Sequence, residues 1–193
     1  MTVTPGAPTG NFTAAEKNKL AGIEDGAQVN KNKTLFISNV DVVVTNTLTE
    51  TTLTGAGVGS LTISAADLVE GAKFKINAQG IISDTGNPNA RIRAKLGSVL
   101  IGDTLDNSLG SISDDHWILD MELVVRAEGA PGAVMASGGF LTSNNDHFAM
   151  VNVGTVGIDT TVDQTVNITF EWGTAAMGNI VTAQILELEC VKV

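Results

Sequence analysis

The chain has 193 residues, with 21 acidic and 11 basic side chains, a formal net charge of −10 and a single cysteine. An acidic surface repels phosphate backbones and anionic lipid heads, so nucleic acid and membranes are poor partners. No apolar run reaches the roughly 18 residues of a membrane helix, no secretory segment opens the chain, and the lone Cys190 excludes an intrachain disulfide and most thiolate metal sites.

Charge and composition both change near residue 33. Residues 1–33 carry four lysines against three acidic residues, whereas residues 34–193 carry seven basic and 18 acidic ones. Residues 1–12 combine Pro, Gly and small polar residues, which is typical of a linker or tail. We therefore predict two parts, a tail with a short helix at 1–33 and a β domain at 34–193.

A short helix is predicted after the tail. Thr13 and Glu16 form a capping box, and good helix formers follow until a glycine within residues 22–26 ends the run. Such a helix has about three turns, which is marginal alone in water. Leu20 and Ile23 form a thin apolar stripe on one side, so we expect the helix to mediate attachment to another protein or trimerisation.

The stretch from His116 to Gly129 predicts the central strand of the β domain. A period of two places alternate residues on opposite faces of a strand. One row is mainly charged, which is typical of an antiparallel strand with one solvated face and one face on a core. The other row is apolar and consists of Trp117, Leu119, Met121, Leu123 and Val125.

Similar patterns continue along the chain and predict roughly ten strands joined by turns. Near the C-terminus, Leu186, Leu188 and Cys190 form another apolar row, so we expect Cys190 in the core. Only a single helical turn is expected in this part, at residues 64–71. The sequence therefore predicts an all-β fold, a jelly-roll-like antiparallel β-sandwich preceded by the short N-terminal helix.

One predicted strand carries three basic side chains on one face, Arg91, Arg93 and Lys95. Such a row could bind an anion. We favour a solvated face that offsets acidic neighbours across the sheet, such as Asp120 and Glu122, because opposite charges stabilise cross-strand pairs.

The candidates for catalysis are sparse. Glycan cleavage needs two carboxylates about 5–10 Å apart, and Asp114–Asp115 or Asp120 with Glu122 could supply them. Such pairs arise freely among 21 acidic residues, and the chain has no Tyr to offer as a platform for a sugar. Nucleophilic catalysis needs a Ser or Cys beside a His, and His116 and His147 are both expected at strand ends. We predict no catalytic residue and no enzyme.

No metal or cofactor is assigned from the sequence. The loop from Asp103 to Asn107 and the run Asp114–His116 offer oxygen ligands of the kind that calcium accepts, but neither spacing matches a known metal loop. Binding of a divalent cation near Asp103–Asp106 or Asp114–Asp115 stays open. The glycine-rich run at residues 55–59 lacks the Lys-Ser/Thr and the following helix of a phosphate-binding loop.

Residues 12–30 (FTAAEKNKLAGIEDGAQVN) resemble an element that recurs in bacteriophage fibre proteins, with the pattern T-A-A-E-K-x-K-L-A-G-I-E-x-G-A-x-V-N. The match covers about a tenth of the chain and nearly every position of the pattern. In that family the element lies before or between the modules of trimeric appendages. The resemblance therefore implies a homotrimer joined to other virion proteins through its N-terminal segment.

Residues 50–193 also resemble, more diffusely, a β domain at the C-termini of phage fibre and spike proteins. This resemblance implies a jelly-roll-like head that assembles as a trimer. The segments that carry it are Gly55–Ile63, Arg91–Leu96, His116–Trp117, Ala136–Gly139 and Glu171–Thr174.

From these resemblances we expect a structural protein at the virion surface, a trimeric fibre or spike head that contacts the host. A host glycan or a host protein is left open as the ligand. The alternative is a capsid decoration protein that clamps neighbouring shell subunits, which the shortness of the chain favours. A glycan-degrading enzyme is a remote third alternative.

Overall fold

The computed structural model describes residues 32–144, 146–150, 152 and 154–191, all within the unit formed by residues 31–193. The predicted helix with Leu20 and Ile23 lies outside the described residues, and so does nearly all of the predicted 1–33 segment. Both stay predictions. No helix in the described part of the chain is long and apolar enough to cross a membrane.

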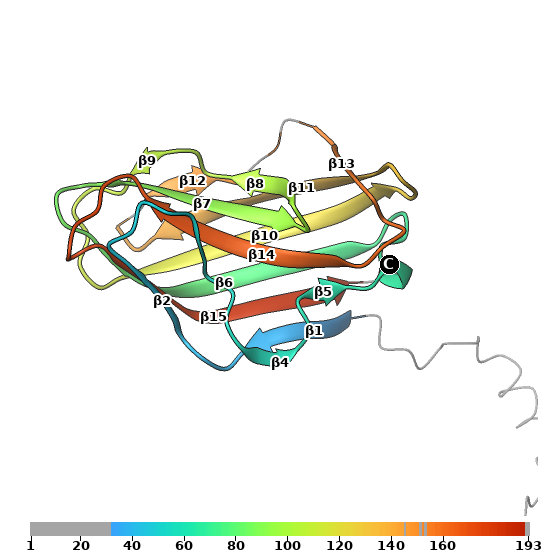
Figure 1. Ribbon diagram of the computed structural model, residues 1–193, viewed down its shortest axis with the longest axis horizontal. Helices are drawn as coiled ribbons and strands as arrows, with labels where there is room; N and C mark the ends of the chain where they lie inside the picture. Colours follow the sequence, from blue (N-terminus) through green and yellow to red (C-terminus); the bar gives the residue numbers. More distant parts are fainter. Residues whose placement is uncertain (1–31, 145, 151, 153, 192–193) are drawn as a thin grey trace, which may run out of the picture. The chain divides into compact units, whose positions relative to one another are not determined.

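The described residues form two antiparallel sheets (Figure 1). The larger has the strand order β12-β11-β10-β6-β15-β1-β4, with β13 beside β11 and β2 beside β15. Its strands are β1 (Asn32–Ser38), β2 (Val42–Thr45), β4 (Gly57–Gly59), β6 (Lys73–Ser83), β10 (Asp115–Ala127), β11 (Gly132–Thr142), β12 (His147–Ala149), β13 (Val156–Ile158) and β15 (Ile180–Val191).

The smaller sheet has the order β3-β14-β7-β8, with β5 beside β14 and β9 beside β7. Its strands are β3 (Thr51–Thr52), β5 (Thr62–Ile63), β7 (Asn89–Leu96), β8 (Val99–Asp103), β9 (Asn107–Ser108) and β14 (Gln164–Trp172). The helical turn expected at residues 64–71 is a short 3-10 helix at Ala65–Asp67, capped by the Ser64 side chain. The strand count exceeds the predicted ten because several connections form strands of two or three residues.

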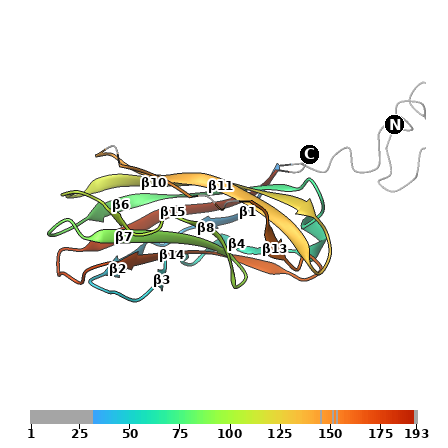
Figure 2. The ribbon, with the colours of Figure 1, turned by 90° about the horizontal axis from the view of Figure 1, so that it is seen from above.

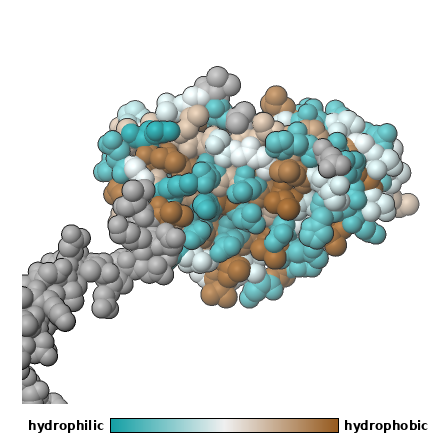
Figure 3. All heavy atoms as spheres, turned by 180° about the vertical axis from the view of Figure 1, so that it is seen from behind, coloured by the Kyte–Doolittle hydropathy of each residue, from teal (hydrophilic) through white to brown (hydrophobic). Residues whose placement is uncertain are grey.

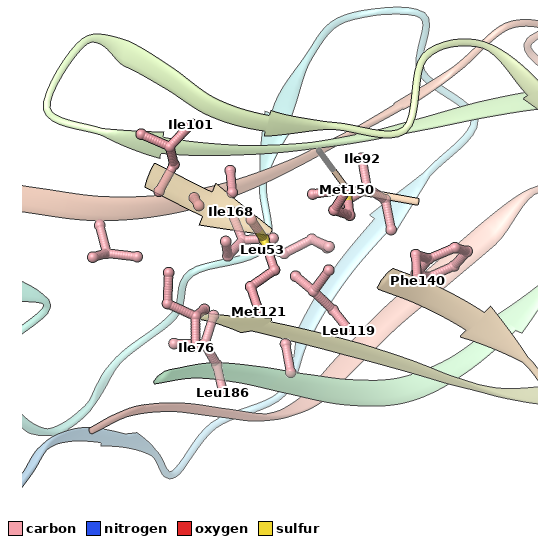
Figure 4. Packing of buried hydrophobic residues seen from close by; sticks show 14 of the residues in the cluster. Leu53, Ile76, Ile92, Ile101, Leu119, Met121, Phe140, Met150, Ile168 and Leu186 are labelled. Atoms are coloured by element: carbon pink, nitrogen blue, oxygen red, sulfur yellow. The ribbon is translucent and has the colours of Figure 1, made fainter. Parts of the chain in front are cut away.

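The two sheets pack face to face, as the view along the layers shows (Figure 2). This confirms the predicted antiparallel β-sandwich. One cluster of buried side chains fills the space between the layers. Figure 4 shows Leu119, Met121 and Ile76 from the larger sheet opposite Ile92 and Ile168 from the smaller one.

Strand β10 has the predicted register. The apolar row from Trp117 to Val125 is at most 1% exposed at each of its five positions, whereas Asp120 and Glu122 face solvent. The strand is flanked in its own sheet by β6 and β11, and its buried apolar row belongs to the cluster between the two sheets. Cys190 is also buried, as predicted.

The two ends of the described chain lie at one end of the sandwich. Asn32 in β1 pairs with Val191 in β15, at the right of Figure 1. At the opposite end, Ser83 pairs with Ile180 and Ala90 with Trp172, so the connections that follow β6 and β14 lie there. The sandwich therefore separates the point where the chain enters from a set of distal loops.

The register of β10 gives a test with a matched control. Leu123→Asp buries an unpaired charge at a fully buried position, and we expect it to destabilise the domain by more than about 3 kcal/mol. Glu122→Gln on the solvated face weakens only the partly exposed pair with Lys73 and should cost less than about 0.5 kcal/mol. Chemical denaturation measures both variants, and equal midpoints would contradict this register.

Candidate functional site

The three basic side chains of β7 lie on the outer face of the smaller sheet, and all three are paired. Arg91 donates to both carboxylate oxygens of Asp103, from Nε at 2.9 Å and from Nη2 at 2.5 Å. Arg93 lies 2.7 Å from Glu171 and 3.5 Å from Glu50. Lys95 also pairs with Glu50. This row is therefore neutralised within its own sheet and does not form an anion site.

The neutralised row confirms the prediction of a solvated, charge-balanced face, but the predicted partners were wrong. Asp120 and Glu122 belong to β10 in the other sheet, where Glu122 pairs with Lys73 at 2.6 Å. Sequence alternation places residues on a face but does not say which strands become neighbours. The true partners come from the segment before β3, from β8 and from β14.

The partners of this row also shift pKa values. The hydrogen bond from Lys95 lowers the pKa of Glu50, with further contributions from Thr169 and Arg93. Burial alone would raise the pKa of Asp103, but the hydrogen bonds from Arg91 and from the Leu105 amide outweigh it and lower the pKa. Both carboxylates are therefore held in the ionised form as structural partners.

The acidic loops do not converge on a metal centre. Among the described residues, no three His, Cys, Asp or Glu side chains are close enough to hold a metal ion. Asp103 is engaged by Arg91, and the Asp114 carboxylate accepts a hydrogen bond from Ser83 at 3.1 Å. His116 and His147 lie at the starts of β10 and β12, as predicted.

The sequence reasoning missed one carboxyl group whose two oxygens are shielded from solvent and poorly hydrogen-bonded. Both oxygens of Asp84, which follows β6, are shielded from solvent, and no described residue donates to either one in good hydrogen-bonding geometry. Burial raises the pKa of Asp84. The nearby amides of Ile112 and Asn87 offset part of this effect, and Asp115 and Asp146 add to it. The sequence around Asp84 does not distinguish this residue from the exposed acidic residues of the chain.

A cleft of about 600 Å³ opens at one side of the sandwich. Its walls come from β8, an edge strand of the smaller sheet, from the turn at residues 104–107, from β12 at the edge of the larger sheet, and from Asn152. These segments are far apart in sequence and contain no motif, so sequence reasoning missed the cleft as well.

The turn beside the cleft is tightly held. The Asp103 carboxylate accepts the Leu105 amide at 2.8 Å, and the Thr104 hydroxyl donates to the Leu105 carbonyl at 3.0 Å. The Asn107 amide nitrogen donates to the carbonyl groups of Thr104 and Leu105. Leu105 itself has a φ of 59° and is 64% exposed, so a bulky side chain is held at the rim in a conformation that such residues rarely adopt.

No protein-family model and no curated protein matches this chain. Among solved structures, the chain is similar to the CBM2 module of the evolved Dit of Lactobacillus casei BL23 phage J-1. That likeness has a TM-score of 0.37 and 8% identity, and it covers 83% of this chain and 77% of the other. A protein of unknown function from Shewanella oneidensis MR-1 has the same TM-score with 11% identity, covering 97% and 96%. At these values neither likeness assigns a family or a function.

The buried carboxyl group gives a test by pH. Because the pKa of Asp84 is raised in the fold, its ionised form destabilises the protein at neutral pH, and this cost disappears as the pH falls towards the unfolded value near 3.8. We expect Asp84→Asn to raise the stability at pH 7 by about 1–2 kcal/mol and to have little effect near pH 4. Thermal melts across this range measure the difference.

Asp103→Asn is the matched control with the opposite sign. The pKa of Asp103 is lowered by its partners, so its contribution is present at neutral pH and is lost as the pH falls below its usual range. The variant should therefore destabilise at pH 7 and approach the wild type in acid. A lower melting temperature for Asp84→Asn at pH 7 would show that this carboxyl group is satisfied after all.

Proposed function

We propose that this protein is a structural component of a bacteriophage particle, a trimeric fibre or spike head displayed at the virion surface. The observation that carries the proposal is the near-complete match of residues 12–30 to the element that recurs in phage fibre proteins. In this proposal the element supplies attachment or trimerisation through Leu20 and Ile23, and the β-sandwich, with jelly-roll-like connections, supplies the head.

The arrangement of the described chain supports a head of this kind. The chain enters β1 and leaves β15 at the same end of the sandwich, where Asn32 pairs with Val191. The loops that follow β6 and β14 lie at the other end (Figure 1). A module joined to a particle through its N-terminal side keeps those loops free for contacts with the host.

The outer face of the larger sheet supports self-association. Leu141, Ile118 and Ile185 occupy one cross-strand row together with Gln79, and each of the three is about two-fifths exposed. Figure 3 shows this face, with apolar side chains (brown) among polar ones (teal). Apolar rows that a monomer leaves in water are typical of surfaces that become buried between subunits.

The proposal includes no catalytic role. Two of the acidic residues considered for glycan cleavage have structural partners. Glu122 forms a salt bridge with Lys73, and Asp114 accepts a hydrogen bond from Ser83. A host contact by binding alone accounts for every feature used above. Glycan cleavage by the purified protein would contradict this part of the proposal.

The first test is the assembly state. We expect light scattering at micromolar concentration and neutral pH to give a mass three times the 19.9 kDa of one chain. Ile118→Glu should weaken the trimer if the outer face is buried in it, because the substitution places a charge in that interface. Val162→Glu, at a half-exposed position in the connection between β13 and β14, is the matched control. A wild-type mass of a single chain would refute the trimer.

The second test is attachment. Deletion of residues 1–33 should leave a folded head that no longer joins the particle, and the Leu20→Asp, Ile23→Asp double variant should lose attachment without unfolding the head. Each variant is supplied during particle assembly, and its retention on purified virions is measured. Normal retention of the deletion would place the anchor in the β domain and favour a capsid decoration protein, which electron microscopy would show as an array over the head.

A further inference from the structure

We propose that the cleft between β8 and β12 binds a neutral saccharide. The proposal rests on the function proposed above, because it names the kind of host ligand that such a head would contact. Four properties of the cleft support it, namely an aromatic platform, two fixed amide groups, a described lining without Lys, Arg or an unpaired carboxylate, and a preformed rim.

The aromatic platform is Phe148 of β12, which is half-buried and lines the cleft. Its ring is stacked on Phe140, with 6.2 Å between centroids and 13° between planes. Phe140 in turn packs against Trp117 at 5.8 Å, and both of these rings are buried. The core therefore holds one face of Phe148 in place, and the remaining exposed part of the ring is left for a ligand. The electron-rich face of such a ring attracts the positively polarised C–H groups of a pyranose.

Two asparagine side chains provide the polar contacts. The Asn152 amide nitrogen donates to the Leu100 carbonyl of β8 at 3.1 Å, and the Asn107 amide nitrogen is bound to carbonyl groups of its own turn. Within the described part of the chain, neither amide oxygen accepts a hydrogen bond. Both are therefore oriented acceptors, and the hydroxyl groups of a sugar are the matching donors.

The charge of the cleft selects a neutral ligand. Its lining contains no Lys or Arg among the described residues, and the only carboxylate in it, Asp103, is occupied by Arg91. Asp106 and Asp146 directly precede the lining residues Asn107 and His147. A sialylated, uronic or phosphorylated sugar would meet repulsion from these carboxylates with no lysine or arginine of the described lining to offset it, and His147 is the one imidazole there. A sugar that carries only hydroxyl or acetamido groups would not.

The rim of the cleft is preorganised. Leu105 is held with a positive φ of 59° by hydrogen bonds at both of its peptide groups. A bulky residue in this conformation persists only where the surroundings impose it, and such positions concentrate at ligand-binding sites. The exposed Leu105 side chain adds a second apolar contact beside Phe148. Because the turn is already ordered, binding costs little conformational entropy there.

The test is binding of the full-length protein to an array of oligosaccharides. The neutral set contains glucose, galactose, rhamnose and N-acetylglucosamine oligomers, and the anionic set contains sialylated, uronic and phosphorylated sugars. We expect binding within the neutral set only. Phe148→Leu keeps the apolar volume and removes the aromatic face, so it should weaken that binding by about three- to tenfold.

Leu105→Gly provides a second variant that relieves the backbone strain and should fold normally, but it should also bind more weakly. Leu48→Ala, at an exposed position on a different loop, is the control that should bind like the wild type. No binding to the neutral set, preferential binding to the anionic set, or unchanged binding by both cleft variants would overturn the proposal. Thermal melts confirm that each variant is folded.

The saccharide-binding test is independent of the two tests of the proposed function. Trimer formation and retention on virions are measured without any sugar, so a protein that passes those tests but binds no neutral saccharide refutes the cleft proposal alone. A protein that binds neutral sugars through Phe148 and Leu105 but is absent from particles refutes the virion assignment and leaves the saccharide site standing.

Discussion

The fold depends on burial of the apolar row of β10 against the smaller sheet. Because side chains alternate with a period of two, a slip of one residue would expose Trp117 and Leu123 and bury Asp120 and Glu122. This penalty fixes the register of β10, and through its ladders it fixes that of β6 and β11. The positions of β12 and of the side of the cleft that it forms follow from that register.

The polar side of the smaller sheet is organised by charge rather than by burial. Glu50, just before the two-residue strand β3, accepts hydrogen bonds from Lys95 of β7 and Thr169 of β14 and lies 3.5 Å from Arg93. These groups are partly shielded from solvent, so salt screens them less than a fully exposed pair. The contacts tie a short edge segment, which has few backbone hydrogen bonds of its own, to two long strands.

The cleft is a consequence of sheet edges that do not pair with each other. β8 ends the smaller sheet and β12 lies at the edge of the larger one, and the space between them is lined by side chains and by the ordered turn at residues 104–107. The buried rings of Trp117 and Phe140 connect the hydrophobic core to Phe148 in the wall of the cleft. Such a cleft needs no moving lid to receive a ligand. In the function proposed above, recognition falls to the sandwich and assembly to the element at residues 12–30.

The sequence by itself determined the class of fold, because the alternation in β10, β14 and β15 is a local property that only a half-buried strand satisfies. It also determined that Cys190 and Trp117 are buried and that the Arg91–Lys95 row is solvated. Only the tertiary structure decided that Glu50, Asp103 and Glu171 neutralise that row, that the Asp84 oxygens are shielded from solvent, and that a cleft lies between β8 and β12. Each of these depends on which distant strands become neighbours, and that choice is made by the packing of the two sheets rather than by any short stretch of residues.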